Sequence, residues 1–133
     1  AKVSSSTITK FLNDNGFNES EIGEPPKTTP ADIALFFDKV YKGELIDKEN
    51  SSKMMDLLKK QQLKDGLPKY LPNATVVAHK TGDVGWFKHD GGIIFSEKGD
   101  YIIVVLSESD SPSGAQERIA LLSKAIWDYF NKP

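Results

Sequence analysis

Lys80, Thr81 and Gly82 place a positive charge, a hydroxyl group and a residue without a side chain next to one another. They follow a β-branched run at residues 75–79, which is typical of a strand. At the rim of a sheet, these groups would face a groove in which a ligand could lie. A tripeptide recurs by chance, and by itself it is interpreted most simply as a polar strand end that enters a turn.

The elements around this triplet predict a sheet with a closing helix. Strands are expected at residues 75–79, 89–95 and 101–106, and the tight turn at residues 97–100 predicts that the last two pair antiparallel. The continuous apolar run at residues 102–106 favours a sheet that is covered on both faces. A helix over residues 113–131 is expected to lie across it, with a buried stripe of Ala115, Ile119, Leu122, Ile126 and Tyr129 or Phe130.

The first 62 residues predict three helices. Residues 5–15 form the first, and Gly16 is its natural end. A second helix is expected to begin at Thr29-Pro30, where Thr29 accepts a backbone N–H, and to end at Gly43. A third is expected over residues 48–62. The predicted core stripes of the last two helices comprise Ile33, Phe36, Phe37, Val40 and Tyr41, and Met54, Leu57 and Leu58. Residues 18–29 and 64–73 contain prolines and are expected to be loops.

Composition excludes several classes of function. The chain has 133 residues, no cysteine and a formal net charge of -2. Disulfides, thiol catalysis and cysteine-ligated zinc are therefore excluded, and no basic excess indicates nucleic acid as a partner. No apolar run is long enough to span a membrane. His79 and His89 lack the neighbours of a metal site, so no metal and no cofactor is expected. For His79, a structural hydrogen bond at a strand end is the favoured interpretation.

An ordered set of segments resembles the class A β-lactamase and D-Ala-D-Ala peptidase superfamily. In chain order they are ITKFLNDNG at residues 8–16, Thr28-Thr29-Pro30-Ala31, Gly43-Glu44-Leu45, Ala78-His79-Lys80-Thr81-Gly82, the strand at residues 90–94 and the last helix. The resemblance implies an α/β (α+β) fold of the β-lactamase/transpeptidase type. Its antiparallel sheet has at least three strands and a packed C-terminal helix, and a helical portion precedes it. The expected parts are a partial helical subdomain at 1–62 and part of the α/β subdomain at 63–133.

The resemblance implies acyl transfer through a serine acyl-enzyme. Lys80 would supply positive charge near the nucleophile, and the Thr81 hydroxyl would bind the substrate carboxylate. Gly82 would let the ligand approach the backbone, and the N–H of Asp83 would be one oxyanion donor. Asp83 and Asp90 are both acidic residues at expected strand ends, where solvated carboxylates are the default. Asp90 is the better functional candidate of the two, and both are assigned to substrate binding.

The sequence also departs from the family pattern. Neither Ser-x-x-Lys nor Ser-Asp-Asn occurs, and the near matches Thr7-x-x-Lys10 and Ser109-Asp110-Ser111 stand in the wrong places. Both true motifs lie upstream in the family order, so the chain is expected to be a C-terminal portion. The omega-loop region is short, without Glu-x-x-Leu-Asn, although Glu21 or Glu24 could approach the site. The usual arginine on the next strand is not evident, since Gly91 falls near its position.

Three hypotheses for function remain open. The first is a truncated, split or proteolysed serine hydrolase that acts on β-lactams or peptidoglycan stem peptides. The second is a binding module of the same fold that has lost the nucleophile, and the third is an unrelated α/β domain with an accidental triplet. An incomplete sheet would need a partner, either the missing N-terminal half or a swapped second copy. The resemblance also implies a location outside the cytoplasmic membrane.

Overall fold

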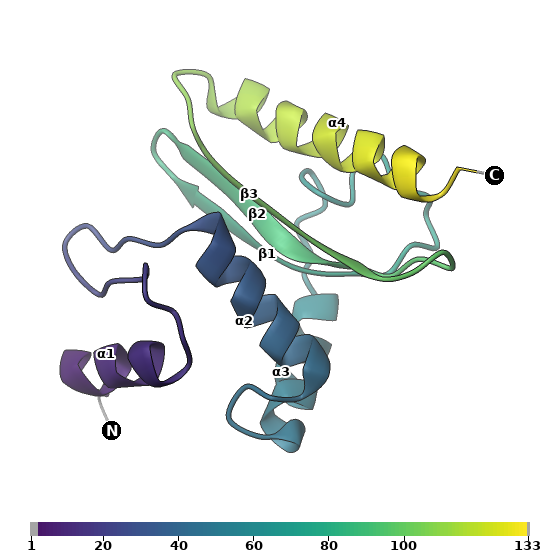
Figure 1. Ribbon diagram of the computed structural model, residues 1–133. Helices are drawn as coiled ribbons and strands as arrows, with labels where there is room; N and C mark the ends of the chain where they lie inside the picture. Colours follow the sequence, from purple (N-terminus) through teal and green to yellow (C-terminus); the bar gives the residue numbers. More distant parts are fainter. Residues whose placement is uncertain (1–2, 133) are drawn as a thin grey trace.

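The computed structural model describes residues 3–132 and contains a three-stranded sheet between two layers of helices (Figure 1). The elements in chain order are α1 (Ser5–Asp14), α2 (Pro30–Lys42), α3 (Lys48–Lys59), β1 (Val77–Val84), β2 (Phe87–Ile94), β3 (Tyr101–Glu108) and α4 (Pro112–Phe130). Helix α4 lies across one face of the sheet, and α2 and α3 cover the other (Figure 1). The predicted α/β (α+β) class and the cover on both faces are confirmed.

The sheet has the order β1-β2-β3, and both pairs of strands are antiparallel. Thr81 pairs with Asp90 and Gly82 pairs with His89, which in turn faces Leu106 on β3. The strand expected at residues 75–79 begins two residues later and continues to Val84. The Lys-Thr-Gly triplet therefore lies inside β1, because the hairpin pairing with β2 runs through it to the turn at Gly85 and Trp86.

The signals for α2 predicted both of its ends correctly. The Thr29 side chain accepts the backbone N–H of Asp32 at 3.2 Å, and Pro30 takes the first helical position. Gly43 ends the helix with a φ of 75°, a left-handed conformation that glycine adopts at little cost.

The predicted buried stripes are partly wrong. Leu57 is 70 % exposed, and Met55 contacts the core in its place. Tyr41 is half exposed, and its hydroxyl donates to Asp100 at 2.8 Å. On α4, Ala115 and Ile119 are buried as expected, but Ser123 takes the buried place foreseen for Leu122, which is exposed. The phase of a short amphipathic helix is ambiguous until its partner surface is known.

Two apolar clusters hold the sheet between the helices. On the α4 face, Leu67, Val77, Ile94 and Ile119 are buried together, with Trp127 against them. On the opposite face, Phe37 of α2 packs against Ala78 and Ile93, which ties the helical portion to the sheet. The division at residues 62 and 63 stays a prediction. Between residues 3 and 132, no helix is long and apolar enough to cross a membrane.

Candidate active-site cleft

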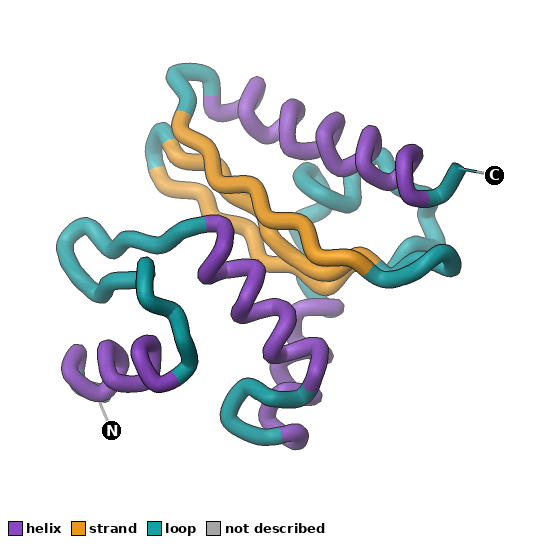
Figure 2. Tube along the Cα trace, in the orientation of Figure 1, coloured by secondary structure: helices purple, strands orange, loops and turns teal. Residues whose placement is uncertain are grey.

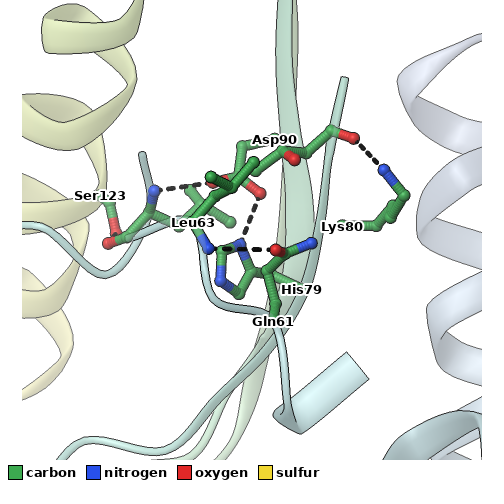
Figure 3. A network of polar contacts seen from close by, with 8 residues as sticks. Gln61, Leu63, His79, Lys80, Asp90 and Ser123 are labelled. Carbon is green, nitrogen blue, oxygen red and sulfur yellow. Dashed lines mark hydrogen bonds and ion pairs between the residues drawn. The ribbon is translucent and has the colours of Figure 1, made fainter. Parts of the chain in front are cut away.

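Strand alternation separates Lys80 from Thr81. Val77 faces α4 and Ala78 faces α2, so odd-numbered residues of β1 lie on the α4 face and even-numbered residues on the other. Lys80 is exposed and projects away from α4, and its Nζ donates to the carbonyl oxygen of Thr81 at 2.5 Å (Figure 3). The sequence predicted that both side chains face one groove. The structure places them on opposite faces of the sheet. Their proposed roles stay predictions.

Thr81 lines a pocket on the α4 face, with a volume of about 410 Å³. The first turn of α4, the connector around Gly66 and the β1–β2 hairpin surround it. Its walls carry paired charges. Lys69 donates to Glu117 at 2.5 Å. This contact raises the pKa of Lys69 and lowers the pKa of the Glu117 carboxyl. Asp83 forms an ion pair with Lys88 at the same rim. We call this hollow the α4-side pocket.

Gly82 also borders a second hollow on the opposite face, with a volume of about 620 Å³. The loop between α1 and α2 forms one wall, and the ends of the three strands form the other. Figure 2 shows the course of this loop and of the strands. The lining is largely apolar and comprises Pro25, Pro26, Lys27, Thr28, Gly82, Asp83, Val84, Phe87, His89, Leu106, Ser107 and Glu108. We call it the loop-side cleft. Ligand sites are commonly of this size and are mostly apolar with few polar groups.

The loop at residues 18–29 borders the cleft without directing a glutamate into it. The backbone N–H of Glu21 donates to the carbonyl of Lys27 at 2.9 Å, and the N–H of Lys27 donates back at 3.1 Å. This closed turn presents Pro25 and Pro26 to the cleft. Neither Glu21 nor Glu24 lines either hollow, so no geometry supports a catalytic role for them.

Asp90 was predicted at a strand end, and the structure places it elsewhere. It occupies the middle of β2 and is fully buried. One carboxylate oxygen lies 2.8 Å from Nδ1 of His79, and the other accepts the backbone N–H of Leu67 at 2.9 Å (Figure 3). A carboxylate that is buried and bonded in this way is not available to a ligand in the cleft. The substrate-binding assignment of Asp90 thus has no geometric support.

The Asp90 contacts belong to a buried network that joins three elements. Ser123 of α4 donates to the carbonyl of Leu67, whose N–H binds Asp90, which binds His79 on β1 (Figure 3). The structural hydrogen bond predicted for His79 is present, while its other ring nitrogen, Nε2, is buried without a partner among the described residues. A Cβ on Gly66 would lie only 2.2 Å from Asp90 Oδ2, so the network depends on that glycine.

His89 is the cleft residue that the sequence analysis missed. It was considered only as a metal ligand, and no group of three potential ligands gathers within residues 3–132. Its imidazole instead lines the loop-side cleft beside Gly82. Counting alternate residues back from the turn at Gly85 and Trp86 would have placed His89 opposite Gly82 and on the face of Lys80.

The comparisons with known proteins come from sequence and from structure. The model of the family described as the beta-lactamase enzyme family matches residues 2–130. No curated protein matches the sequence. Many solved structures share the fold. A beta-lactamase from Sphaerobacter thermophilus DSM 20745 has a TM-score of 0.89 and 21% identity, over 96% of this chain and 54% of that one.

Two further structures extend the likeness to a penicillin-binding relative. TLA-1 extended spectrum beta-lactamase has a TM-score of 0.83 and 25% identity, over 97% of this chain and 55% of that one. PBP-A carrying the L158E mutation, described as an acyl-enzyme complex with penicillin-G, has a TM-score of 0.87 and 23% identity, with 96% and 52% covered. The chain spans about half the length of these structures. From the sequence match and the shared fold together, this chain belongs to the beta-lactamase enzyme family.

Proposed function

We propose that this chain is the Lys-Thr-Gly-bearing portion of a serine hydrolase that forms an acyl-enzyme with β-lactams or D-Ala-D-Ala-type peptides. The observation that carries the proposal is the position of Lys80, Thr81 and Gly82 on β1. This strand pairs only with β2 among the described residues, so one of its edges is open. A peptide-like acyl group can add to such an edge through backbone hydrogen bonds.

The arrangement supports a different role for each residue of the triplet on β1. Lys80 places its charge on the face of the loop-side cleft, and Thr81 places its hydroxyl at the α4-side pocket. Gly82 borders both hollows. A ligand along the edge of β1 would lie between them and meet positive charge and backbone N–H groups. Donors aimed at a developing oxyanion are the largest single contribution in many acyl-transfer enzymes.

The nucleophile of the proposed enzyme would lie outside the given sequence. The chain contains no Ser-x-x-Lys, and the matched structures are nearly twice as long. Strand β3 has an open edge among the described residues, and its Ile102–Leu106 stretch contains no charge. Leu121 and Leu122 are exposed on the outer side of α4. A complementary segment or a second copy would cover these apolar surfaces. The assembled protein would act outside the cytoplasmic membrane.

Covalent labelling by a fluorescent penicillin tests the proposal. Residues 1–133 are assembled with the segment of the coding sequence that contains Ser-x-x-Lys, either as one chain or as two, and the product is analysed by intact mass. We expect the label on the serine of that segment only when residues 1–133 are present. Lys80→Ala should slow acylation by about 10²-fold or more, whereas Lys53→Ala on the exposed side of α3 should not.

Two results would contradict the hydrolase assignment. One is an assembled protein that takes up no label, and the other is labelling that Lys80→Ala leaves unchanged. Reversible binding of a D-Ala-D-Ala peptide without any covalent label would favour the second candidate, a non-catalytic binding module.

A further inference from the structure

We infer that His89 is a neutral hydrogen-bond donor that binds an acceptor oxygen of the acyl ligand in the loop-side cleft. The inference rests on the proposed function and adds a binding residue to it. It starts from one contact. The backbone N–H of Ser107 on β3 donates to Nδ1 of His89 at 3.1 Å.

This contact determines where the imidazole carries its proton. A backbone N–H can only donate, so Nδ1 must be an unprotonated acceptor. In neutral histidine the proton then resides on Nε2. Protonation of Nδ1 would point two N–H groups at each other and break the contact with Ser107. The strand therefore holds His89 in the Nε2–H tautomer.

The geometry of the sheet directs the protonated edge of the ring towards β1. Ser107 lies on β3, on one side of β2, and Gly82 lies on β1, on the other side. The ring atom Cδ2, which is bonded to Nε2, would be only 3.2 Å from a Cβ built on Gly82. The absence of a side chain at Gly82 thus leaves room beside the imidazole for a ligand on the β1 edge.

The surroundings of His89 are mostly apolar, so a single N–H donor there can orient a ligand. The side chain is half buried, and Phe87 lies beside it with ring centroids 5.9 Å apart. Leu106 and Pro26 are further apolar parts of the cleft wall. Among residues 3–132, Nε2 of His89 makes no hydrogen bond within the protein. In a mostly apolar cleft, one well-placed N–H group determines how a ligand is oriented.

Charge in the cleft fits a carbonyl or carboxylate oxygen as the acceptor. Lys27 borders the cleft from the loop, and Lys80 lies on the same face of β1. Asp83 and Glu108 also border it. Asp83 is already paired with Lys88. The neutral donor of His89 can bind either kind of oxygen, and the test distinguishes them.

Nuclear magnetic resonance of the assembled protein, with residues 1–133 labelled with ¹⁵N, tests the tautomer. Long-range ¹H–¹⁵N spectra at neutral pH should show Nδ1 of His89 as unprotonated and Nε2 as protonated. Addition of benzylpenicillin, or of an acetylated D-Ala-D-Ala peptide, should move the Nε2 resonance. A predominant Nδ1–H form, or an Nε2 resonance that no probe moves, would overturn the inference.

Two substitutions separate ligand binding from a structural role. His89→Asn retains an acceptor near Nδ1 for the Ser107 N–H but loses the donor at Nε2. His89→Gln extends an amide N–H towards the position of Nε2 but loses the acceptor. We expect His89→Asn to weaken peptide binding about tenfold with little change in stability. His89→Gln should bind within about twofold of the wild type and be less stable, because the Ser107 N–H is left unpaired.

The chemical form of the peptide identifies the acceptor oxygen. Loss of affinity for the free acid alone, with the C-terminal amide unaffected, assigns His89 to the carboxylate. Equal losses assign it to a carbonyl oxygen. If His89→Asn binds both peptides like the wild type, while the assembled protein is still labelled by penicillin, the inference fails and the hydrolase assignment stands. If labelling fails but the His89 effects persist, only the covalent chemistry is refuted.

Discussion

Removal of the Asp90 carboxylate should destabilise the protein more than any surface substitution. Asp90→Ala leaves two buried donors without a partner, the Leu67 N–H and His79 Nδ1–H. Each unpaired buried donor costs about 1–3 kcal/mol, so the expected loss is about 4 kcal/mol. Moving the His79 proton to Nε2 offers no relief, because that nitrogen is also buried without a partner. A loss of this size is a large share of the 5–15 kcal/mol that is typical of a domain.

Asp90→Asn provides the graded comparison. An amide can still accept from Leu67 and donate to Nδ1 of His79 if the imidazole moves its proton to Nε2. Two buried N–H groups are then unpaired, Nε2–H of His79 and the second amide N–H, but no cavity forms, so the expected loss of about 2–4 kcal/mol stays below that of the alanine variant, which also loses packing. Asp38→Asn, in an exposed pair with Lys42 on α2, is the matched control and should change stability by about 0.5 kcal/mol at most.

Urea unfolding, followed by circular dichroism and by tryptophan fluorescence, measures these differences. The midpoint should fall in the order Asp38→Asn, Asp90→Asn, Asp90→Ala, with the slope unchanged. A loss below about 1 kcal/mol for Asp90→Ala would refute the reasoning. So would an asparagine variant that is as unstable as the alanine variant, since the alanine side chain leaves a cavity and the amide does not.

Three further results are expected. Gly92→Ala should prevent normal hairpin pairing, because its Cβ would lie 2.3 Å from the carbonyl oxygen of Ala78. Circular dichroism should then show a loss of β-sheet signal, and a native spectrum would contradict the prediction. Phe37→Ala should cost about 3–5 kcal/mol in urea unfolding, because the ring is buried between α2 and the sheet; a loss below 1 kcal/mol would contradict that packing. Burial raises the pKa of Tyr101 from 10.0 to about 12. The unfolded chain therefore loses this proton first, and stability should fall as pH rises from about 10 to 12. Tyr101→Phe should be less sensitive over that range than the wild type, and equal pH profiles would contradict the assignment.

Local sequence signals determined the elements and the position of the triplet. Thr29, Pro30 and Gly43 carry their own capping and turn preferences, which act within a few residues and could be recognised without a structure. The ordered segments around Lys80-Thr81-Gly82 predicted the family, and the match over residues 2–130 confirms it. The antiparallel sheet and its closing helix followed from period-2 and helical patterns.

Only the tertiary structure decided which groups meet. Pairing with β2 extends β1 to Val84, so Lys80 and Thr81 are successive strand residues and face opposite sides of the sheet. The sequence alone shows Asp90 only as a polar residue in a strand. In the structure, the connector brings the Leu67 N–H to its carboxylate, and the neighbouring strand β1 brings His79. His89 joins the cleft for the same reason, since β3 binds one edge of its ring and Gly82 leaves space at the other. Burial and hydrogen-bond partners depend on segments far apart in the chain, and local residue preferences carry no record of them.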